Sequence, residues 1–185
     1  MLVIRYKFSV LFLFLFLSFA YSDNYKSVEL DTLFEKLSKI DSPNQATLIE
    51  KKIWKVWNKH PKNDKLTNKL KFGRELMSEG SYNYALQIFT NIIRTDPLWS
   101  EAWNARATLF FYMNNYKESL KDIDKVLDLE PRHFGALSGR AQILIKLEQY
   151  GKAINDLREI KKIHPSITED RLIEKLEKLI KGLSI

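Results

Sequence analysis

The stretch DLEPRHFGALSGRA, at residues 128–141, places Arg132 and His133 beside two glycines immediately before a helix-like run. Cationic side chains and glycines at a helix N-terminus can form a site for an anion or a phosphate group, because unpaired backbone N–H groups point outward there. The same residues are equally typical of a connection between two helices, where they serve turn geometry. The helices predicted on either side of residues 128–141 help to decide between an anion site and a connection between helices.

The prolines reveal how those elements are arranged. Pro97, Pro131 and Pro165 lie 34 residues apart. When blocks 66–99, 100–133 and 134–167 are aligned without gaps, small, aromatic and apolar residues recur in the same columns, which is the signature of an internal repeat. The small columns are Gly73, Ala107 and Ala141, and Ala85, Ser119 and Ala153; the aromatic column is Tyr82, Tyr116 and Tyr150; the apolar columns are Phe89, Ile123 and Leu157, and Ile92, Val126 and Ile160. Each block therefore predicts a helix, a tight turn, a second helix and a proline stop.

These blocks resemble the tetratricopeptide repeat. Trp103 stands in the tryptophan column of that repeat, ALQIF (residues 85–89) in its alanine–aromatic columns, and the three prolines at the repeat ends. Leu137 in place of the tryptophan and Ser119 in place of the alanine are departures. The resemblance covers residues 66–167 and implies an all-α fold, an α-solenoid of antiparallel helix pairs. More narrowly, IWKVWN, WNARATLFF and LEPRHFGALSGRA resemble small exported tetratricopeptide repeat proteins of Gram-negative bacteria.

The chain is expected to divide into six segments. Leu33, Leu37, Ile40, Ile49, Ile53, Val56 and Pro61 repeat the pattern weakly and out of phase before the first block, which suggests a degenerate helix pair. At the other end, Thr168 is a candidate N-cap for an amphipathic helix that stops at Gly182 and covers the last repeat. The predicted segments are 1–22, a signal peptide; 23–65, a degenerate helix pair and linker; 66–99, 100–133 and 134–167, three repeats; and 168–185, a capping helix.

The N-terminus predicts export. Arg5 and Lys7 precede an apolar run that ends at the small-residue pattern Ala20-Tyr21-Ser22, the order of a secretory signal peptide cleaved after Ser22. An uncleaved membrane anchor is the alternative, but the run from Phe8 to Ala20 is shorter than the roughly 20 residues that a spanning helix needs. We expect a periplasmic protein that meets the membrane only during export or peripherally. Because the sequence contains no cysteine, it has no disulfide bond.

The resemblance places function on the concave surface, which the first helix of each repeat lines. By spacing, that surface is mixed polar and aromatic, which suits an extended peptide or a partner helix. We therefore expect a non-catalytic protein-protein interaction module, an exported adaptor or assembly factor. The candidate partner-binding residues are Arg74, Asn104, Thr108, Tyr112, Ser138 and Gln142.

An alternative function rests on charge. The formal net charge is +7, and residues 51–74 hold eight lysines and Arg74 against only Asp64. Such a segment could associate with anionic lipid or a cell-wall polymer, or it could be a solvated lysine-rich helix face. Nucleic acid is not an expected partner, since an exported protein would seldom meet it.

The remaining polar residues favour structural roles. Arg106 and Arg140 each precede an aspartate, Asp122 and Asp156, by the same interval, which predicts an ion pair between the two helices of a repeat. His60, His133 and His164 lie too far apart along the repeats to share a metal, and the sequence has no HExxH, phosphate-loop or G-x-S-x-G motif. We expect no metal, no cofactor and no enzymatic activity. Within residues 128–141, the assignment to tetratricopeptide repeats leaves only Arg132 and His133 without a structural role.

Overall fold

The computed structural model describes residues 28–167 and 169–182, and every regular element in that part of the chain is an α-helix. The helices are α2 (Val28–Ser38), α3 (Pro43–Asn58), α4 (Asp64–Ser78), α5 (Tyr82–Thr95), α6 (Ser100–Tyr112), α7 (Tyr116–Leu129), α8 (Phe134–Lys146), α9 (Tyr150–Ile163) and α10 (Asp170–Gly182). The predicted signal peptide and the predicted N-cap Thr168 lie outside the described residues. Among the helices described, none is long and apolar enough to cross a membrane.

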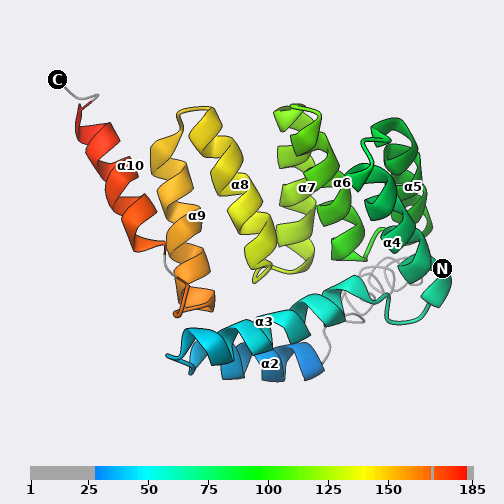
Figure 1. The fold of residues 1–185 in the computed structure, drawn as a ribbon, viewed down its shortest axis with the longest axis horizontal. Coiled ribbons are helices and arrows are strands. Elements are labelled where there is room, and N and C mark those ends of the chain that lie inside the picture. Colours follow the sequence, from blue (N-terminus) through cyan, green and yellow to red (C-terminus); the bar gives the residue numbers. More distant parts are fainter. Residues whose placement is uncertain (1–27, 168, 183–185) are drawn as a thin grey trace, which may run out of the picture.

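Helices α4 to α9 form a row of antiparallel pairs that ends at α10, with successive helices running in opposite directions (Figure 1), and the first helices of neighbouring pairs also contact each other, α4 with α6 and α6 with α8. α4 packs on α5, α6 on α7 and α8 on α9, and α10 lies against α9 at the end of the row. The small residues of the repeat columns lie buried where paired helices approach each other, as do Phe89, Ile123 and Leu157. The predicted all-α solenoid of antiparallel helix pairs is confirmed.

The turn inside each repeat has the same backbone conformation. Gly80, Asn114 and Glu148, one residue per repeat at equivalent positions, have φ values of 77°, 56° and 58°. Glycine and asparagine adopt this left-handed conformation readily, whereas glutamate does so at a cost. The backbone of the turn is therefore retained in the third repeat although its residue type is not.

The N-terminal pair does not extend the row. α2 and α3 pack on each other and cross one end of the upright helices, α2 against α9 and α3 against α6 (Figure 1). One core cluster joins α2 and α3 to α8, α9 and α10, and it includes Phe34, Trp57, Phe134 and Leu157. The pair thus covers the lower ends of the later repeats instead of stacking beside α4 as a preceding repeat would.

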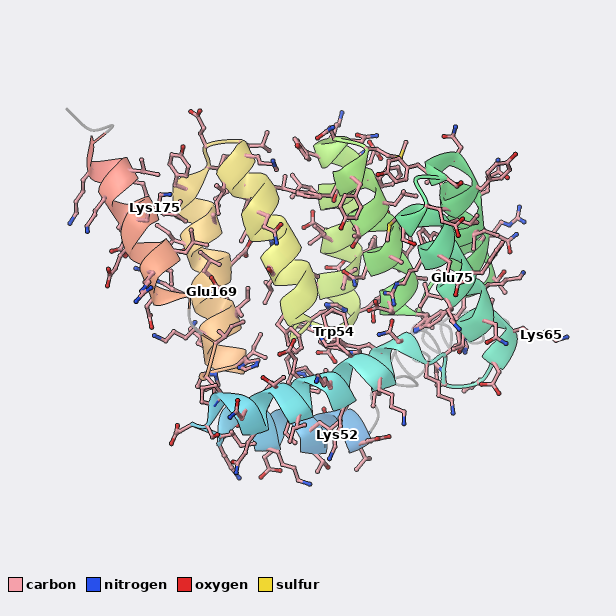
Figure 2. All side chains as sticks on the ribbon, viewed as in Figure 1. Lys52, Trp54, Lys65, Glu75, Glu169 and Lys175 are labelled. Atoms are coloured by element: carbon pink, nitrogen blue, oxygen red, sulfur yellow. The ribbon has the colours of Figure 1, made fainter. Side chains whose placement is uncertain are left out.

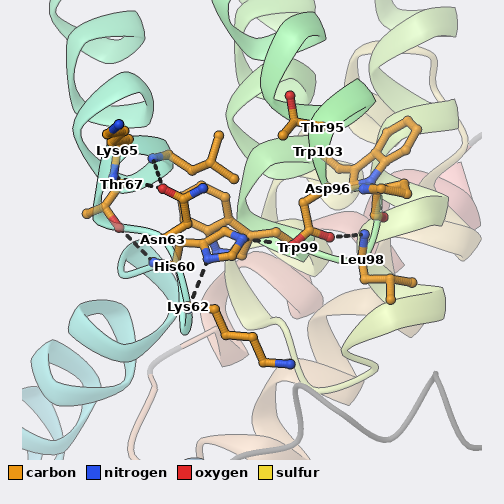
Figure 3. Close-up of polar contacts among 12 residues, drawn as sticks. His60, Lys62, Asn63, Lys65, Thr67, Thr95, Asp96, Leu98, Trp99 and Trp103 are labelled. Carbon is orange, nitrogen blue, oxygen red and sulfur yellow. Dashed lines mark hydrogen bonds and ion pairs between the residues drawn. The ribbon is translucent and has the colours of Figure 1, made fainter.

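The connection between α3 and α4 is fastened to the turn that follows α5 (Figure 3). Nδ1 of His60 accepts the backbone N–H of Lys62 at 3.1 Å, so the ring proton lies on Nε2, which donates to Asp96 at 2.8 Å. The other carboxylate oxygen of Asp96 accepts the N–H of Leu98, and the backbone N–H of His60 donates to Thr67. These bonds hold the end of α3 at the start of the array.

The two predicted ion pairs are confirmed. The guanidinium of Arg106 donates to both carboxylate oxygens of Asp122, at 2.7 and 2.8 Å. Arg140 forms the same fork with Asp156, at 2.9 and 2.7 Å. Each pair ties the first helix of a repeat to the second helix, and the bidentate geometry fixes their relative rotation.

Gly73 offers a test of how closely paired helices approach. A Cβ at this position would lie 2.5 Å from Cε1 of the Phe89 ring, which belongs to the buried core. We expect Gly73→Ala to lower the free energy of unfolding by roughly 1–3 kcal/mol, because the ring or the helix must shift. Urea unfolding followed by circular dichroism measures the change.

Gly139→Ala is the matched control, because a Cβ there meets Ile123 at 3.8 Å, an ordinary contact. Both glycines are inside helices, so alanine should stabilise at position 139 by up to about 1 kcal/mol. Equal effects of the two substitutions would contradict the close approach at Gly73.

Candidate functional site

A cavity of about 210 Å³ opens between α6 and α8 and reaches down to α7. Four of the predicted partner-binding residues line it: Asn104, Thr108, Tyr112 and Gln142. The small residues of α8 leave room opposite α6: they are Gly135, Ala136 and Gly139. Ser119 and Ile123 of α7 form the floor of the cavity. The structure therefore gathers residues from two repeats around one hollow with polar and aromatic walls.

The aromatic part of this wall is accessible to a partner. Tyr112 lines the cavity and is 55% exposed. Its ring lies edge-on to Phe111, whose own ring is approached by the ammonium group of Lys146 at 5.9 Å. An exposed tyrosine next to a hollow provides apolar area and a hydrogen-bonding hydroxyl at little cost in side-chain entropy.

The other two predicted residues do not line the cavity. Ser138 lies one turn before Gln142 on α8 and accepts a long hydrogen bond from its amide, at 3.4 Å. Arg74 on α4 is directed to Asn58 and Glu101, with both of which it forms hydrogen bonds. These contacts hold Arg74 outside the lining of the cavity.

A buried carboxylate lies next to the cavity at the start of α6. Glu101 is completely buried, and one of its oxygens accepts from Arg74 and from the Asn104 amide at 3.1 Å. The other oxygen faces Nε2 of His133 at 3.0 Å. Nδ1 of His133 accepts the N–H of Ala136, so Nε2 carries the ring proton and donates to Glu101. Through Asn104, this network reaches the cavity wall.

The network keeps Glu101 ionised. Burial alone would raise the pKa of this carboxyl group, but the hydrogen bond from His133 and the positive charge of Arg74 act in the opposite direction. With the Asn104 amide added, the pKa of Glu101 lies below its usual value. The charged form is therefore the one that the folded protein stabilises.

α3 packs against the lower part of the predicted concave surface. The Trp57 ring stacks on His133 with a centroid separation of 4.0 Å and an angle of 8° between the ring planes. Trp54, on the side of α3 that faces α8 (Figure 2), lies so close to Gly135 that a Cβ there would be 2.5 Å from the indole. The close approach of α3 to α8 therefore requires glycine at position 135. α3 covers the end of the concave surface near Gly135, and the part that stays open, near Tyr112, is called the groove below.

Both residues that lacked a structural role at the sequence level have one. His133 belongs to the Glu101 network, and Arg132 forms ion pairs with Asp31 and Glu130 at 2.8 and 2.9 Å. The Arg132 guanidinium also lies over the Phe34 ring at 4.3 Å. The turn at residues 131–133 therefore anchors the N-terminal pair, and its positive charge is neutralised within the chain.

The basic segment 51–74 is divided among several environments. α3 ends at Asn58 and α4 begins at Asp64, so the segment spans two helices and the turn between them. Lys71 pairs with Glu75 at 3.8 Å, while Lys52, Lys55 and Lys59 line a separate cleft beside α2. The segment does not form one continuous charged helix face.

The three histidines each face a different carboxylate. His60 meets Asp96, His133 meets Glu101, and His164 lies 3.6 Å from Glu50. Across residues 28–167 and 169–182 there is no cluster of three or more side chains of the types that hold metal ions.

Sequence reasoning missed the contribution of α3. Asn58, Trp54 and Trp57 belong to a weakly periodic segment, and nothing in the repeat pattern assigns them to the groove. The unusual pair of tryptophans in IWKVWN is the one signal that could have drawn attention to them, since such large side chains are costly to leave exposed.

The chain is similar to a known protein family and to known proteins. Residues 100–133 match the tetratricopeptide repeat family. A tetratricopeptide repeat-containing protein of Rhizobium etli is 39% identical over 115 residues, which are 62% of this chain and 56% of that protein. Human DnaJ homolog subfamily C member 3 is 31% identical over 61% of this chain and 22% of its own length. The chain thus spans little more than half of the first relative and about a fifth of the second.

Solved structures share the fold. The first tetratricopeptide domain of Spaghetti (RPAP3), bound to an HSP90 peptide, matches with a TM-score of 0.60 at 18% identity, covering 64% of this chain and 94% of that domain. The type III secretion chaperone SycD of Yersinia enterocolitica, in complex with a peptide of the translocator YopD, matches with a TM-score of 0.55 at 12% identity, covering 68% and 97%. At these identities the likeness establishes the architecture.

Glu101→Gln should destabilise the protein and change its acid sensitivity. Glutamine keeps one acceptor oxygen but replaces the other with an NH2 donor, so it cannot accept from both Arg74 and His133, and the Arg74 charge loses its buried counter-charge; this should cost roughly 1–3 kcal/mol at pH 7. Because the folded pKa lies below the unfolded one, this stabilisation is present above the usual carboxyl value of 4.5 and is lost as the pH falls toward the folded pKa. The variant should therefore lose less stability than the wild type on acidification.

Denaturant unfolding at several pH values from neutral to acid measures this difference. Glu174→Gln, at an exposed position of α10, is the control and should match the wild type throughout. Parallel pH dependence in the wild type and Glu101→Gln would show that the network does not hold the charge.

Proposed function

We propose that this chain, with its tetratricopeptide repeat fold, is a non-catalytic module that binds a short peptide or a helix of another protein above the crossing of α3. The observation that carries the proposal is the hollow between α6 and α8, with Asn104, Thr108, Tyr112 and Gln142 in its walls. A partner side chain that entered it would find polar groups to bond and the exposed Tyr112 ring to cover.

The similar proteins support this reading at the level of the fold. Two of the solved neighbours hold peptides, one from HSP90 and one from a translocator. The two ends of the groove differ. α3 covers the end near Gly135, whereas the end near Tyr112 is accessible. We infer that the partner segment is short and engages the second and third repeats.

We further propose that the protein acts in the periplasm as an adaptor or assembly factor. The basis is the order of basic, apolar and small residues in segment 1–22. A partner would then be another exported protein or a membrane protein with a segment exposed to the periplasm.

Substitutions at the exposed rim test the groove. The double variant Tyr112→Ser/Gln142→Ala should lose at least tenfold in affinity for peptides selected on the wild-type protein from a displayed random library, because an aromatic anchor is removed from the rim of the hollow. Neither residue is in the buried core, so the helical circular dichroism spectrum should be unchanged.

Tyr84→Ser is the matched control. Tyr84 is also a helical tyrosine, 67% exposed, but it lies on α5 and does not line the cavity. It should leave the affinity for the selected peptides as it is in the wild type. Equal binding by the double variant and the control would place the binding surface elsewhere.

Export makes a separate prediction. Expressed in a Gram-negative host, the protein should be recovered in the periplasmic fraction with an intact mass that begins at Asp23, because cleavage is expected after Ser22. Replacing Ala20 with a bulky charged residue should block cleavage. An intact mass that retains Met1 or residues 2–22, in membrane or cytoplasm, contradicts the proposal.

A further inference from the structure

A second cleft lies on a different part of the molecule from the groove, and nothing in the proposed function uses it. It has a volume of about 860 Å³ and runs along α2 and α3 to the turn that follows α5. This volume is within the range of roughly 300–1,000 Å³ that is typical of small-molecule sites. The cleft shares no residue with the cavity between α6 and α8.

The walls of this cleft combine lysines with an apolar interior. Lys36 on α2 and Lys52, Lys55 and Lys59 on α3 and its end line it, and Glu29 is the one acidic residue among its lining residues. None of the four lysines forms an ion pair with another residue in the described part of the chain. Among the described residues, four cations therefore line one cleft with a single carboxylate, that of Glu29, beside them (Lys52 is labelled in Figure 2).

The interior is formed by buried side chains, among them Leu33, Trp57 and Trp99. The cleft thus offers apolar surface beside positive charge.

We infer that this cleft binds a single-chain anionic amphiphile, with the alkyl chain against the apolar interior and the anionic head among the four lysines. Charge complementarity selects an anion. An extended peptide fits less well, because α2 and α3 use their backbone groups within the helices and offer no free edge to pair with peptide amides. An alkyl chain has no such groups to satisfy.

Calorimetric titration of the full-length protein with dodecanoate and tetradecanoate, each below its micelle concentration, tests the inference. The longer chain should bind roughly tenfold more tightly, because two further methylene groups are buried. Raising the ionic strength from about 50 to about 500 mM should weaken binding several-fold, since the lysines are exposed to solvent. Dodecyltrimethylammonium, with the opposite head charge, should bind at least tenfold more weakly than dodecanoate.

Matched variants locate the site. Removal of the four lysines should weaken dodecanoate binding by roughly tenfold or more, at a few-fold per exposed charge. A control variant that loses the same charge from exposed lysines elsewhere should bind as the wild type does, and so should the groove variant Tyr112→Ser/Gln142→Ala. The test variant is Lys36→Gln/Lys52→Gln/Lys55→Gln/Lys59→Gln, and the control is Lys65→Gln/Lys71→Gln/Lys117→Gln/Lys152→Gln.

Thr32→Trp addresses the apolar interior. Thr32 lines the cleft from an exposed position of α2, so a large side chain can occupy the space without entering the core. It should reduce binding of both carboxylates while the circular dichroism spectrum stays helical. Three results would overturn the inference: equal binding of the cationic and anionic amphiphiles, equal effects of the two quadruple variants, or binding of a glutamate-rich peptide at these lysines with no binding of either carboxylate.

Discussion

A carboxylate that is removed from water must be surrounded by donors, and Glu101 meets this requirement with groups from separate parts of the chain. Arg74 comes from α4, Asn104 from α6 itself, and His133 from the turn before α8; Arg74 also reaches Asn58 at the end of α3. Since each donor must be at hydrogen-bond distance, α3, α4, α6 and α8 are fixed relative to one another. The first helices of all three repeats and the crossing pair are thereby joined at one point.

The groove depends on the hydrogen-bond network around Glu101. Asn104 uses its amide group to bond Glu101 while it lines the cavity, so the buried charge and the cavity wall share a residue. The bidentate pairs Arg106–Asp122 and Arg140–Asp156 set the rotation of α6 and α8 on their partner helices. The buried charge therefore joins α6 to the start of α8, and each ion pair fixes one wall of the cavity on its partner helix.

The repeat columns were sufficient to predict the helices of the array, their buried small residues and the ion pairs, because each of these depends on positions within one repeat or between adjacent helices. Glu148 shows that even the turn conformation follows the repeat where the residue type does not. The crossing of α2 and α3 could not be predicted in this way. It depends on contacts between residues far apart in the chain, such as Trp54 with Gly135 and Trp57 with His133. The periodicity of a repeat carries no information about such contacts. For the same reason Arg74 was expected in the groove but is directed to Asn58 and Glu101.

The crossing pair also changes how the chain has to fold. In a simple solenoid each repeat touches only its neighbours, so structure can start in any repeat and spread along the chain. Here Phe34 contacts Phe134, and the Ser166 hydroxyl bonds the carbonyl of Ile40 across 126 residues of sequence. Closing so long a loop carries an entropic cost before any contact compensates for it, which slows folding relative to local pairing. α2, α3 and the third repeat thus form one cooperative unit, and the array cannot gain or lose a repeat in its middle without moving the surface on which α2 and α3 rest.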